Sequence, residues 1–377
     1  MTGIVAAADA YDDWLRDQLG GDAIEEDLAD RRRKMAKGPF PFFRATYWRW
    51  AETVGKDWTP DRPGQAVLAV GDIHLENFGT WRDAEGRLAW GVNDFDEAAV
   101  MPWPLDLLRL ATSALLARDA GPAVAGQADA RAIMAGYHAG LSIPRPIVLD
   151  HDFAWLRGQV MAVRDEKAWK KQEEARSEFW TSKMAPPDPM PDRRPPARMI
   201  EALLASLPPG ASITGVWPRS AGAGSLGRPR WVLRADWQGG PILREAKAML
   251  PSAWLRVVPA APFLCRAAEV AQGAYRAPDP FLTFHDGVAV RRLSPNNSKL
   301  EAKDHAERLL DPEMLDAMGR DLAGIHAATP GAAAHILAEI AQGKPLDLAG
   351  QALAAAADRL AARARQEQAT LRRAMKD

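Results

Sequence analysis

Short apolar runs separated by polar turns are the first pattern along the chain. Residues 67–70 and 88–92 are apolar and rich in β-branched side chains, and each run is short enough to be a strand. Asp83, Glu85 and Gly86 lie between the two runs and are typical of a turn. The pattern predicts a hairpin whose two strands both lead into polar residues at their carboxyl ends.

Longer stretches with apolar positions at three- and four-residue spacing predict helices. The predicted helical segments are residues 5–35, two helices within 104–142, a charged helix or helix pair within 150–184, residues 314–328 and residues 331–377. The prolines of residues 186–196 forbid regular structure, which predicts a linker or a lid. We expect the apolar stripe of residues 314–328 to pack against the helix at residues 104–118.

A second group of strands follows the proline-rich segment. Gly222, Gly224 and Gly227 have the spacing G-x-G-x-x-G. A dinucleotide-binding fingerprint requires a helix directly after its third glycine. Here Pro229 intervenes and the apolar residues 231–233 indicate a strand. The glycines therefore belong either to an ordinary hairpin loop or to a loop whose backbone N–H groups cover phosphates.

Two turn signals divide the rest of this region into further strands. Gly239-Gly240 closes one strand before the next, and Asp286-Gly287 lies between two more. Arg244 and Lys247 follow the first turn, and Arg291 follows the second. The succession of strand, glycine loop, strand, turn and strand favours the phosphate-covering interpretation.

Composition narrows the class of protein. The 377 residues suffice for two lobes, and a net charge of −1 gives no basic field of the kind that nucleic-acid binding requires. Cys265 is the single cysteine, which excludes an internal disulfide and fits a reducing compartment. The chain start lacks the basic region and long apolar core of a secretory signal, and no apolar run approaches the ~20 residues that span a bilayer. We therefore expect a cytoplasmic protein without nucleic-acid or membrane partners.

Carboxylates and amides cluster where the two predicted strands of the first hairpin end. Asp72, His74 and Asn77 follow the first strand, and Asp94 and Asp96 follow the second. Such a cluster repels itself unless a cation lies within it, and oxygen ligands of this kind suit Mg²⁺. The sequence therefore predicts a magnesium site at this edge.

The same stretch resembles known phosphotransferases. GDIHLENFG at residues 71–79 resembles the G-D-x-H-x-x-N loop of aminoglycoside and choline kinases, and VNDFDEA at residues 92–98 resembles their I-D-F-x-x-A segment. Residues 104–110 resemble their D-L-A-R-L helix, in which Asp106 would be a structural anchor. The chain as a whole resembles an uncharacterised bacterial family of the protein-kinase-like superfamily, whose P-F-x-F-F-R motif stands here at residues 39–44.

The resemblance implies an α+β, protein-kinase-like two-lobe fold with a helical C-lobe and a small β-rich N-lobe. Residues 1–200 would form the helical lobe with the catalytic and metal loops, residues 205–300 the β-rich nucleotide-binding lobe, and residues 301–377 helices that return to the helical lobe. In the relatives the glycine loop precedes the catalytic loop, whereas here it follows. We therefore expect a circularly permuted fold, a rearrangement that exposed chain ends tolerate.

The resemblance also implies roles for residues of the first hairpin. Asp72 would orient or deprotonate the acceptor hydroxyl, and His74 would support the loop by hydrogen bonding. Asn77 and Asp94 would hold Mg²⁺, and Asp96 would bind a second ion.

A further set of residues would bind the cofactor, which is ATP or another NTP. The residues that would cover its phosphates are Gly222, Gly224, Ser225 and Gly227. The relatives carry a lysine on the third strand of the lobe, which favours Lys247 as the phosphate-binding cation, whereas strand register favours Arg244. Residues 290–294, with Arg291, are the candidate segment beside the base.

These observations predict an ATP- and Mg²⁺-dependent phosphotransferase acting on a hydroxyl of an unidentified acceptor, a small molecule in preference to a protein. Val70 stands where the relatives have the histidine of H-G-D, which leaves open a non-catalytic nucleotide-binding pseudokinase. A metal-dependent phosphoesterase is a weaker alternative, because the further Asp, Asn and His motifs of a two-metal site do not follow. Transfer of AMP in place of phosphate is also compatible with the motifs.

Overall fold

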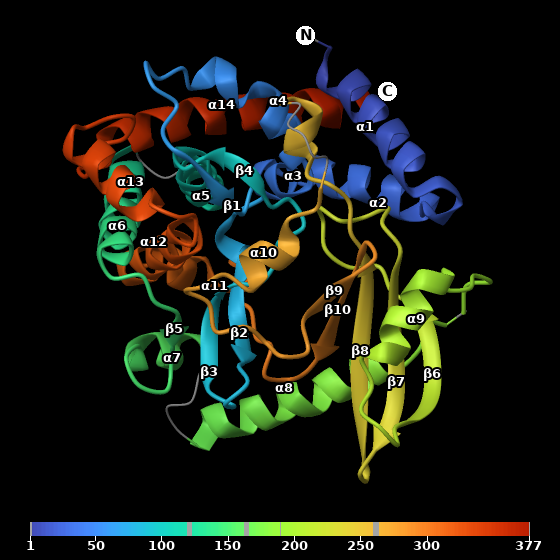
Figure 1. Ribbon diagram of the computed structural model, residues 1–377. Helices are drawn as coiled ribbons and strands as arrows, with labels where there is room; N and C mark the ends of the chain where they lie inside the picture. Colours follow the sequence, from blue (N-terminus) through green and yellow to red (C-terminus); the bar gives the residue numbers. More distant parts are fainter. Residues whose placement is uncertain (1, 119–122, 162–165, 189, 259–263, 377) are drawn as a thin grey trace.

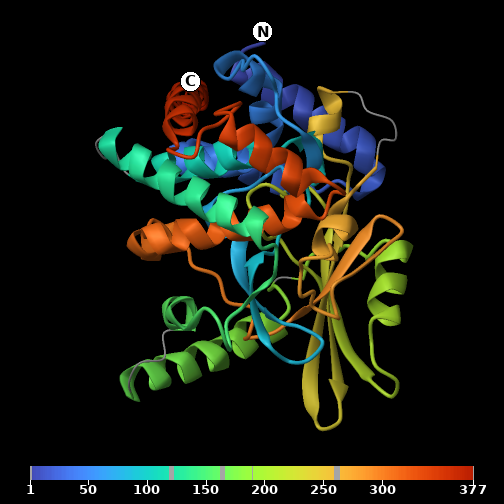
Figure 2. The same ribbon diagram turned by 60° about the vertical axis from the view of Figure 1, so that its left-hand side comes forward.

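Most helices lie at one end of the molecule and a five-stranded antiparallel sheet lies at the other (Figures 1 and 2). The computed structural model describes residues 2–118, 123–161, 166–188, 190–258 and 264–376. Helices and strands occur in separate groups along the chain, so the fold is of the α+β type predicted from the sequence. Both chain ends lie at the same end of the molecule, among the helices (Figures 1 and 2).

Helices open the chain and close it. The first four are α1 (Ile4–Leu19), α2 (Glu25–Ala36), α3 (Pro39–Ala45) and α4 (Tyr47–Asp57). The single helix predicted for residues 5–35 is therefore wrong, because the chain breaks at Gly20, where φ is +55°. Arg31 of α2 and Asp12 of α1 form a buried ion pair that holds the two helices together.

Two small sheets carry the polar loops that the sequence singled out. Their strands are β1 (Ala66–Ala69), β2 (Phe78–Arg82), β3 (Leu88–Val92), β4 (Ala99–Pro102) and β5 (Ile147–Val148). The predicted turn before β3 is present, and Asp83 accepts backbone hydrogen bonds from Glu85 and Arg87 within it. The predicted pairing is wrong, because β3 pairs with β2 while β1 pairs with β4. The loops after β1 and β3 nevertheless meet, as described below.

The larger sheet has the strand order β6-β7-β8-β10-β9. Its strands are β6 (Ser212–Pro218), β7 (Arg230–Trp237), β8 (Gly240–Ala248), β9 (Thr283–His285) and β10 (Val288–Leu293). The glycine-rich residues 219–229 join β6 to β7. Two-residue turns join β7 to β8 and β9 to β10, and their central residues have positive φ, as such tight hairpins require.

Each face of this sheet is covered by a helix. On one face, α9 (Ala197–Ala205) packs Met199 and Leu203 against Trp231 and Leu233 of β7. On the other face, α8 (Glu166–Met184) packs Phe179 and Trp180 against a cluster that holds Trp217, Val232, Leu243 and Leu293. The stretch between α8 and α9 has no regular structure in its described residues, as its prolines predict.

The helical end is built from segments far apart in sequence. The remaining α-helices of the described chain are α5 (Pro104–Ala117), α6 (Ala123–Ser142), α7 (Ala154–Met161), α10 (Ala267–Ala271), α11 (Ala302–Leu309), α12 (Pro312–Ala327), α13 (Ala332–Ala341) and α14 (Gln351–Ala374), of which α7 lies beside β5 and α8 (Figure 1). The predicted packing of residues 314–328 on the first of these helices is wrong, because α12 packs along α6. The long helix α14 covers α5 instead. The final third of the chain therefore completes the core that the first third begins.

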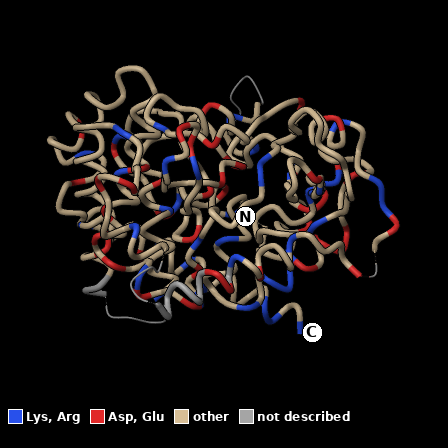
Figure 3. The backbone as a smooth tube through the Cα atoms, turned by 90° about the horizontal axis from the view of Figure 1, so that it is seen from below, with Lys and Arg blue, Asp and Glu red and all other residues tan. Residues whose placement is uncertain are grey.

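Charge is spread evenly over the fold. Figure 3 shows Lys and Arg interspersed with Asp and Glu along the chain, in keeping with the net charge of −1. Among the described residues, no helix combines the length and the apolar character needed to cross a membrane.

Candidate functional site

The loops after β1 and β3 meet the glycine-rich loop in one small pocket. This pocket has a volume of about 90 Å³. The sequence-predicted residues that line it are Asp72, His74, Asn77, Asp94, Asp96, Gly222, Gly224 and Ser225. More than a hundred residues separate the carboxylate loops from the glycine loop, so the chain topology brings these groups together.

Asp72 is held from one side by a buried arginine. Arg109 of α5 donates from Nε to Asp72 Oδ1 at 3.1 Å, and its side chain is fully buried. The guanidinium lies 4.1 Å from the Phe43 ring centroid and also donates to the Phe43 carbonyl. Burial raises the pKa of Asp72, and the charge of Arg109 opposes this rise. The arrangement fixes Oδ1 and leaves Oδ2 directed at the glycine loop, where it is 3.1 Å from the ideal Cβ position of Gly224.

A second buried carboxylate anchors the loop that contains Asp72. Asp106 of α5 accepts the backbone N–H groups of Val70 and Gly71 at 2.7 and 2.9 Å. Gly71 has a φ of +80°, and a Cβ there would lie 2.2 Å from the Glu97 carbonyl oxygen. Only glycine fits at this position. The anchoring role expected for Asp106 is thus present, and it fixes the backbone just before Asp72.

His74 and Asn77 complete the loop. The Nδ1 atom of His74 accepts the N–H of Glu76 at 3.1 Å, and burial together with nearby Arg44 holds the pKa of His74 well below its usual value. This histidine is therefore neutral and supports the loop locally. Asn77 donates from Nδ2 to the Asp72 carbonyl at 3.0 Å, whereas its buried Oδ1 atom has no hydrogen-bond partner within the described part of the chain.

A lysine from the five-stranded sheet reaches the second carboxylate loop. Lys247 of β8 lies 3.4 Å from Asp94 Oδ1 and also forms an ion pair with Asp96. Although loss of water around Asp94 works in the opposite direction, the cations Lys247 and Lys299 hold its pKa well below the usual value. Asp94 is therefore ionised throughout the physiological pH range.

The glycine loop lies over these carboxylates, and contacts with other segments hold its C-terminal end in place. Gly222 adopts a φ of +78°, and Ser225 accepts a hydrogen bond from Arg230 at 3.0 Å. Gly227 lies outside the pocket lining, where its carbonyl accepts the N–H of Ile24 and its Cα faces Leu28. The N-terminal helices thus hold the far end of the loop.

The two cations proposed for β8 lie on opposite faces of the sheet. Lys247 points to the carboxylates of Asp94 and Asp96, whereas Arg244 lies over the Phe281 ring and donates to the Ser206 carbonyl. Residues three apart on a strand point to opposite faces, so one strand cannot bring both to the same ligand. The structure thus leaves Lys247 as the β8 cation beside the carboxylates.

Arg291 lies in the lining of two cavities beside the pocket, at the end of β10. It donates from Nε to Glu245 Oε1 at 2.8 Å. Arg219 and Arg230 bind the same carboxylate. Although burial works in the opposite direction, these three guanidinium groups hold the pKa of Glu245 well below its usual value.

The pocket offers oxygen ligands for a metal without forming a closed cage. Among the described residues, no three His, Cys, Asp or Glu side chains lie together as a preformed metal site. Asn77 Oδ1 is a buried oxygen that no described residue hydrogen-bonds, and the Asp94 carboxylate is ionised, so these two fit Mg²⁺. Asp96 fits less well, since Lys247 pairs with one of its oxygens and Arg228 lies 3.7 Å from the other.

Three cations of the site were not assigned from the sequence. Arg109 lies one turn after Asp106 within the quoted helix motif, which was the available signal. Arg228 forms an ion pair with the buried Glu97 at 2.7 Å. A glutamate in the sequence does not by itself predict which distant arginine will pair with it. Lys299 lines the pocket from the segment after β10, and no pattern surrounds it in the sequence. Desolvation, together with Arg291 and Arg44, lowers the pKa of Lys299 to about 8 against the opposing pull of Asp94.

Comparison with known proteins gives one match. The family described as "Uncharacterized protein conserved in bacteria (DUF2252)" matches residues 23–141, about a third of the chain. This stretch includes Asp72, Asn77, Asp94 and Arg109. Comparisons with curated proteins and with solved structures gave no significant match.

Proposed function

We propose that this chain is a nucleotide- and Mg²⁺-dependent phosphotransferase with a circularly permuted, kinase-like two-lobe arrangement. The observation that carries the proposal is the contact of the glycine loop with the carboxylate loops. The ideal Cβ of Gly224 lies 3.1 Å from Asp72 Oδ2, and Gly222, Asn77 and Asp94 line the same pocket. Kinase-type phosphotransferases combine these groups, with a glycine-rich loop above an Asp, an Asn and a metal-binding Asp.

The order of strands supports the same proposal. Kinase-type enzymes have the glycine loop before the strand that carries the phosphate-binding lysine. Here the glycine loop joins β6 to β7, and Lys247 lies on β8, the next strand of the sheet. Lys247 reaches Asp94 across 153 residues of sequence. The helices after residue 301 pack on those before residue 150, which is what a permuted chain requires.

In this proposal Asp72 positions the acceptor hydroxyl. Arg109 fixes its Oδ1 atom, and its Oδ2 atom would accept the hydroxyl proton as the hydroxyl oxygen bonds to the terminal phosphorus of the nucleotide and the nucleoside diphosphate leaves. Burial favours the protonated form of Asp72, so the carboxyl can hold that proton once it is transferred. Because phosphoryl transfer needs little covalent chemistry from the protein, this positioning is the main contribution of Asp72.

Asn77 and Asp94 would hold Mg²⁺, which supplies positive charge to the nucleotide phosphates when bound. Lys247 would exchange its ion pairs with Asp94 and Asp96 for the phosphates. Lys299 lines the pocket and adds a second cation. Together with Arg44 and Arg228 of the same lining, these side chains would offset the charge of a triphosphate beside the carboxylates.

A larger cavity next to the pocket supports a place for the base. It has a volume of about 320 Å³ and shares Lys299 with the pocket. Trp81, Phe95 and Leu282 line it together with residues 291–294, the segment expected beside the base. Flat apolar and aromatic walls of this kind suit a nucleobase.

The test measures nucleotide binding and turnover on the full chain. ATP and GTP should raise the melting temperature more with Mg²⁺ than without, because binding to the folded state stabilises it. Asp94→Asn should abolish the Mg²⁺-dependent part, and Asp72→Asn should keep binding while losing turnover by at least about 100-fold. Glu85→Gln, an exposed change in the neighbouring turn, is the control and should behave as wild type.

The outcomes separate the alternatives. Binding without turnover in the wild-type chain would replace this proposal with the non-catalytic nucleotide-binding interpretation. Release of pyrophosphate with a nucleotidylated product would indicate transfer of AMP. Failure of every nucleotide to bind, with or without Mg²⁺, would overturn the proposal.

A further inference from the structure

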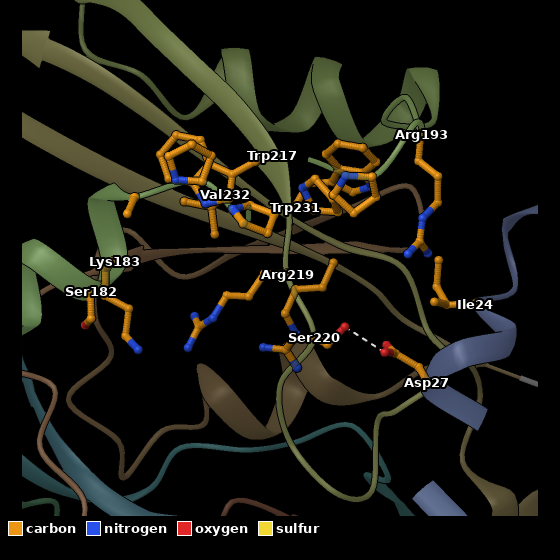
Figure 4. A pocket seen from close by; sticks show the side chains of 16 residues that line it. Ile24, Asp27, Ser182, Lys183, Arg193, Trp217, Arg219, Ser220, Trp231 and Val232 are labelled. Atoms are coloured by element: carbon orange, nitrogen blue, oxygen red, sulfur yellow. Dashed lines mark hydrogen bonds between the residues drawn. The ribbon is translucent and has the colours of Figure 1, made fainter. Parts of the chain in front are cut away.

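A second cavity lies outside the Asp72 pocket, where the glycine loop begins. It has a volume of about 480 Å³ and is bounded by the end of α8, β6 and β7, and the start of α2. The proline-rich segment after α8 contributes Ala185, Pro186, Pro187, Pro191 and Arg193. Arg219 and Ser220, the first residues of the glycine loop, form part of its wall (Figure 4). Asp72, Asp94 and Lys247 are not among its lining residues. Lys183 and Arg219 also line the 320 Å³ cavity proposed above for the base, so the two cavities adjoin at these side chains.

Positive charge dominates the described lining of this cavity. Four cations line it, which are Lys183, Arg193, Arg219 and Arg230, against the single carboxylate of Asp27. Asp27 accepts a hydrogen bond from the Ser220 hydroxyl at 2.6 Å, so its carboxylate binds the glycine loop and forms no ion pair with these four cations. The nearby Glu245 is shared among Arg219, Arg230 and Arg291 and neutralises one charge in three.

Lys183 stands out among these cations. Within the described parts of the chain it has no ion pair, although it is half-buried. Figure 4 shows its ammonium beside the guanidinium of Arg219, on the same wall of the cavity. Desolvation and then Arg219 lower its pKa. An unpaired, partly desolvated lysine beside an arginine is costly unless an anion binds there.

The opposite wall is apolar and flat. Trp217 and Trp231 lie above Lys183 and Arg219 in Figure 4, and Pro186, Pro187 and Pro191 also line the cavity. Rigid rings of this kind bind the body of a ring-shaped or apolar molecule at small entropic cost.

We propose that this cavity binds a small organic anion, whose phosphate or carboxylate group lies between Lys183 and Arg219 and whose apolar body packs below Trp217. This site goes beyond the proposed function: it shares Lys183 and Arg219 with the cavity proposed for the base, but anion binding there needs neither nucleotide nor Mg²⁺. Because Arg219 and Ser220 begin the glycine loop, an occupant also contacts the loop that closes over Asp72.

The test uses three ring compounds that differ in charge. Phenyl phosphate, benzoate and the neutral benzyl alcohol are titrated into the full chain by calorimetry, without nucleotide or Mg²⁺. We expect both anions to bind at least tenfold more tightly than the alcohol, and their order tells whether the site prefers phosphate or carboxylate. Equal binding of the alcohol, or no binding of either anion, would overturn the proposal.

A charge-removing variant places the binding in this cavity. Lys183→Gln should weaken binding of the preferred anion by about fivefold and leave the melting temperature unchanged or higher, because an unpaired cation is removed. Lys56→Gln, an exposed lysine of α4 outside the cavity, is the matched control and should bind as wild type. Unchanged anion affinity in Lys183→Gln would count against the assignment, whatever the nucleotide experiments show.

Discussion

The carboxylate of Asp106 lies 3.1 Å from Nε2 of His326, although 220 residues separate them. Both side chains are fully buried, and Tyr137 contacts the other ring nitrogen of His326 at 2.7 Å. The same carboxylate accepts the N–H groups of Val70 and Gly71. Asp106 therefore connects the backbone just before Asp72 to α12, in the last third of the chain.

Replacing this carboxylate should destabilise the whole helical end. Asp106→Asn removes one acceptor oxygen and the charge that strengthens three hydrogen bonds, at a cost of about 2–4 kcal/mol of unfolding free energy. Urea denaturation measures the change. Asp61→Asn, at an exposed position, is the control and should stay within about 0.5 kcal/mol of wild type. An Asp106→Asn midpoint equal to that of wild type would contradict the anchoring role.

The grouping of the candidate site could be read from sequence because it depends on residue types. Asp72, Asn77 and Asp94 were expected to meet Gly222 and Gly224, and the structure brings all five into one pocket. Glycines in a loop and clustered carboxylates indicate a binding site by residue type alone, whatever secondary structure surrounds them. Their catalytic and binding roles stay predictions.

The pairing of strands β1 to β4 could not be predicted from the sequence. Residues 78–82, which form β2, begin directly after Asn77 and include a glycine and an arginine, so they do not form an apolar run. β1 instead pairs with residues 99–102, which form an equally short apolar run. Strand pairing is a tertiary outcome that periodicity does not specify.

The sequence pattern also could not predict which helix packs against α12. A leucine-rich stripe needs an apolar face, but several helices offer one. Close approach decided the choice, because Gly136 and Gly140 of α6 and Gly319 of α12 let the two backbones nearly touch. Small residues at a helix contact are informative only when both helices are known.

The glycine loop should be sensitive to a single methyl group. In Gly224→Ala the new Cβ would lie 3.1 Å from Asp72 Oδ2 and 3.2 Å from the Arg44 carbonyl oxygen. The loop must then shift from Asp72, and we expect nucleotide affinity or turnover to fall by about tenfold or more, with a stability change below about 1 kcal/mol. Gly240→Ala, with open space around its Cβ, is the control. Equal activity in both variants would show that the loop does not act on Asp72.

Lys299 predicts how nucleotide binding depends on pH. Its pKa of about 8 lies below the ordinary lysine value, so its ammonium loses a proton between pH 7 and pH 9 in the unliganded protein. Phosphates attract the charged form, and their last ionisation, with a pKa of about 6, is largely complete above pH 7. Affinity should therefore decrease as pH rises through 8. Lys299→Gln should bind more weakly at pH 7 and lose this pH dependence, which titration calorimetry at pH 7, 8 and 9 can measure. A pH profile that is the same in both proteins would remove Lys299 from the site.

The junction of the first and last thirds of the chain can be tested with a pair of glycine substitutions. In Gly136→Ala a Cβ on α6 would lie 1.9 Å from the carbonyl oxygen of Asp316 on α12, so the two helices must separate. We expect a loss of about 2–3 kcal/mol of unfolding free energy, despite the better helix propensity of alanine. Gly55→Ala in α4 introduces the same side chain into a helix with open space around it, and should gain about 0.5–1 kcal/mol. Opposite shifts of the urea midpoint would show that contact between α6 and α12 limits stability. If both variants become more stable, α12 does not pack against α6 as described, and the permuted arrangement loses its main structural support.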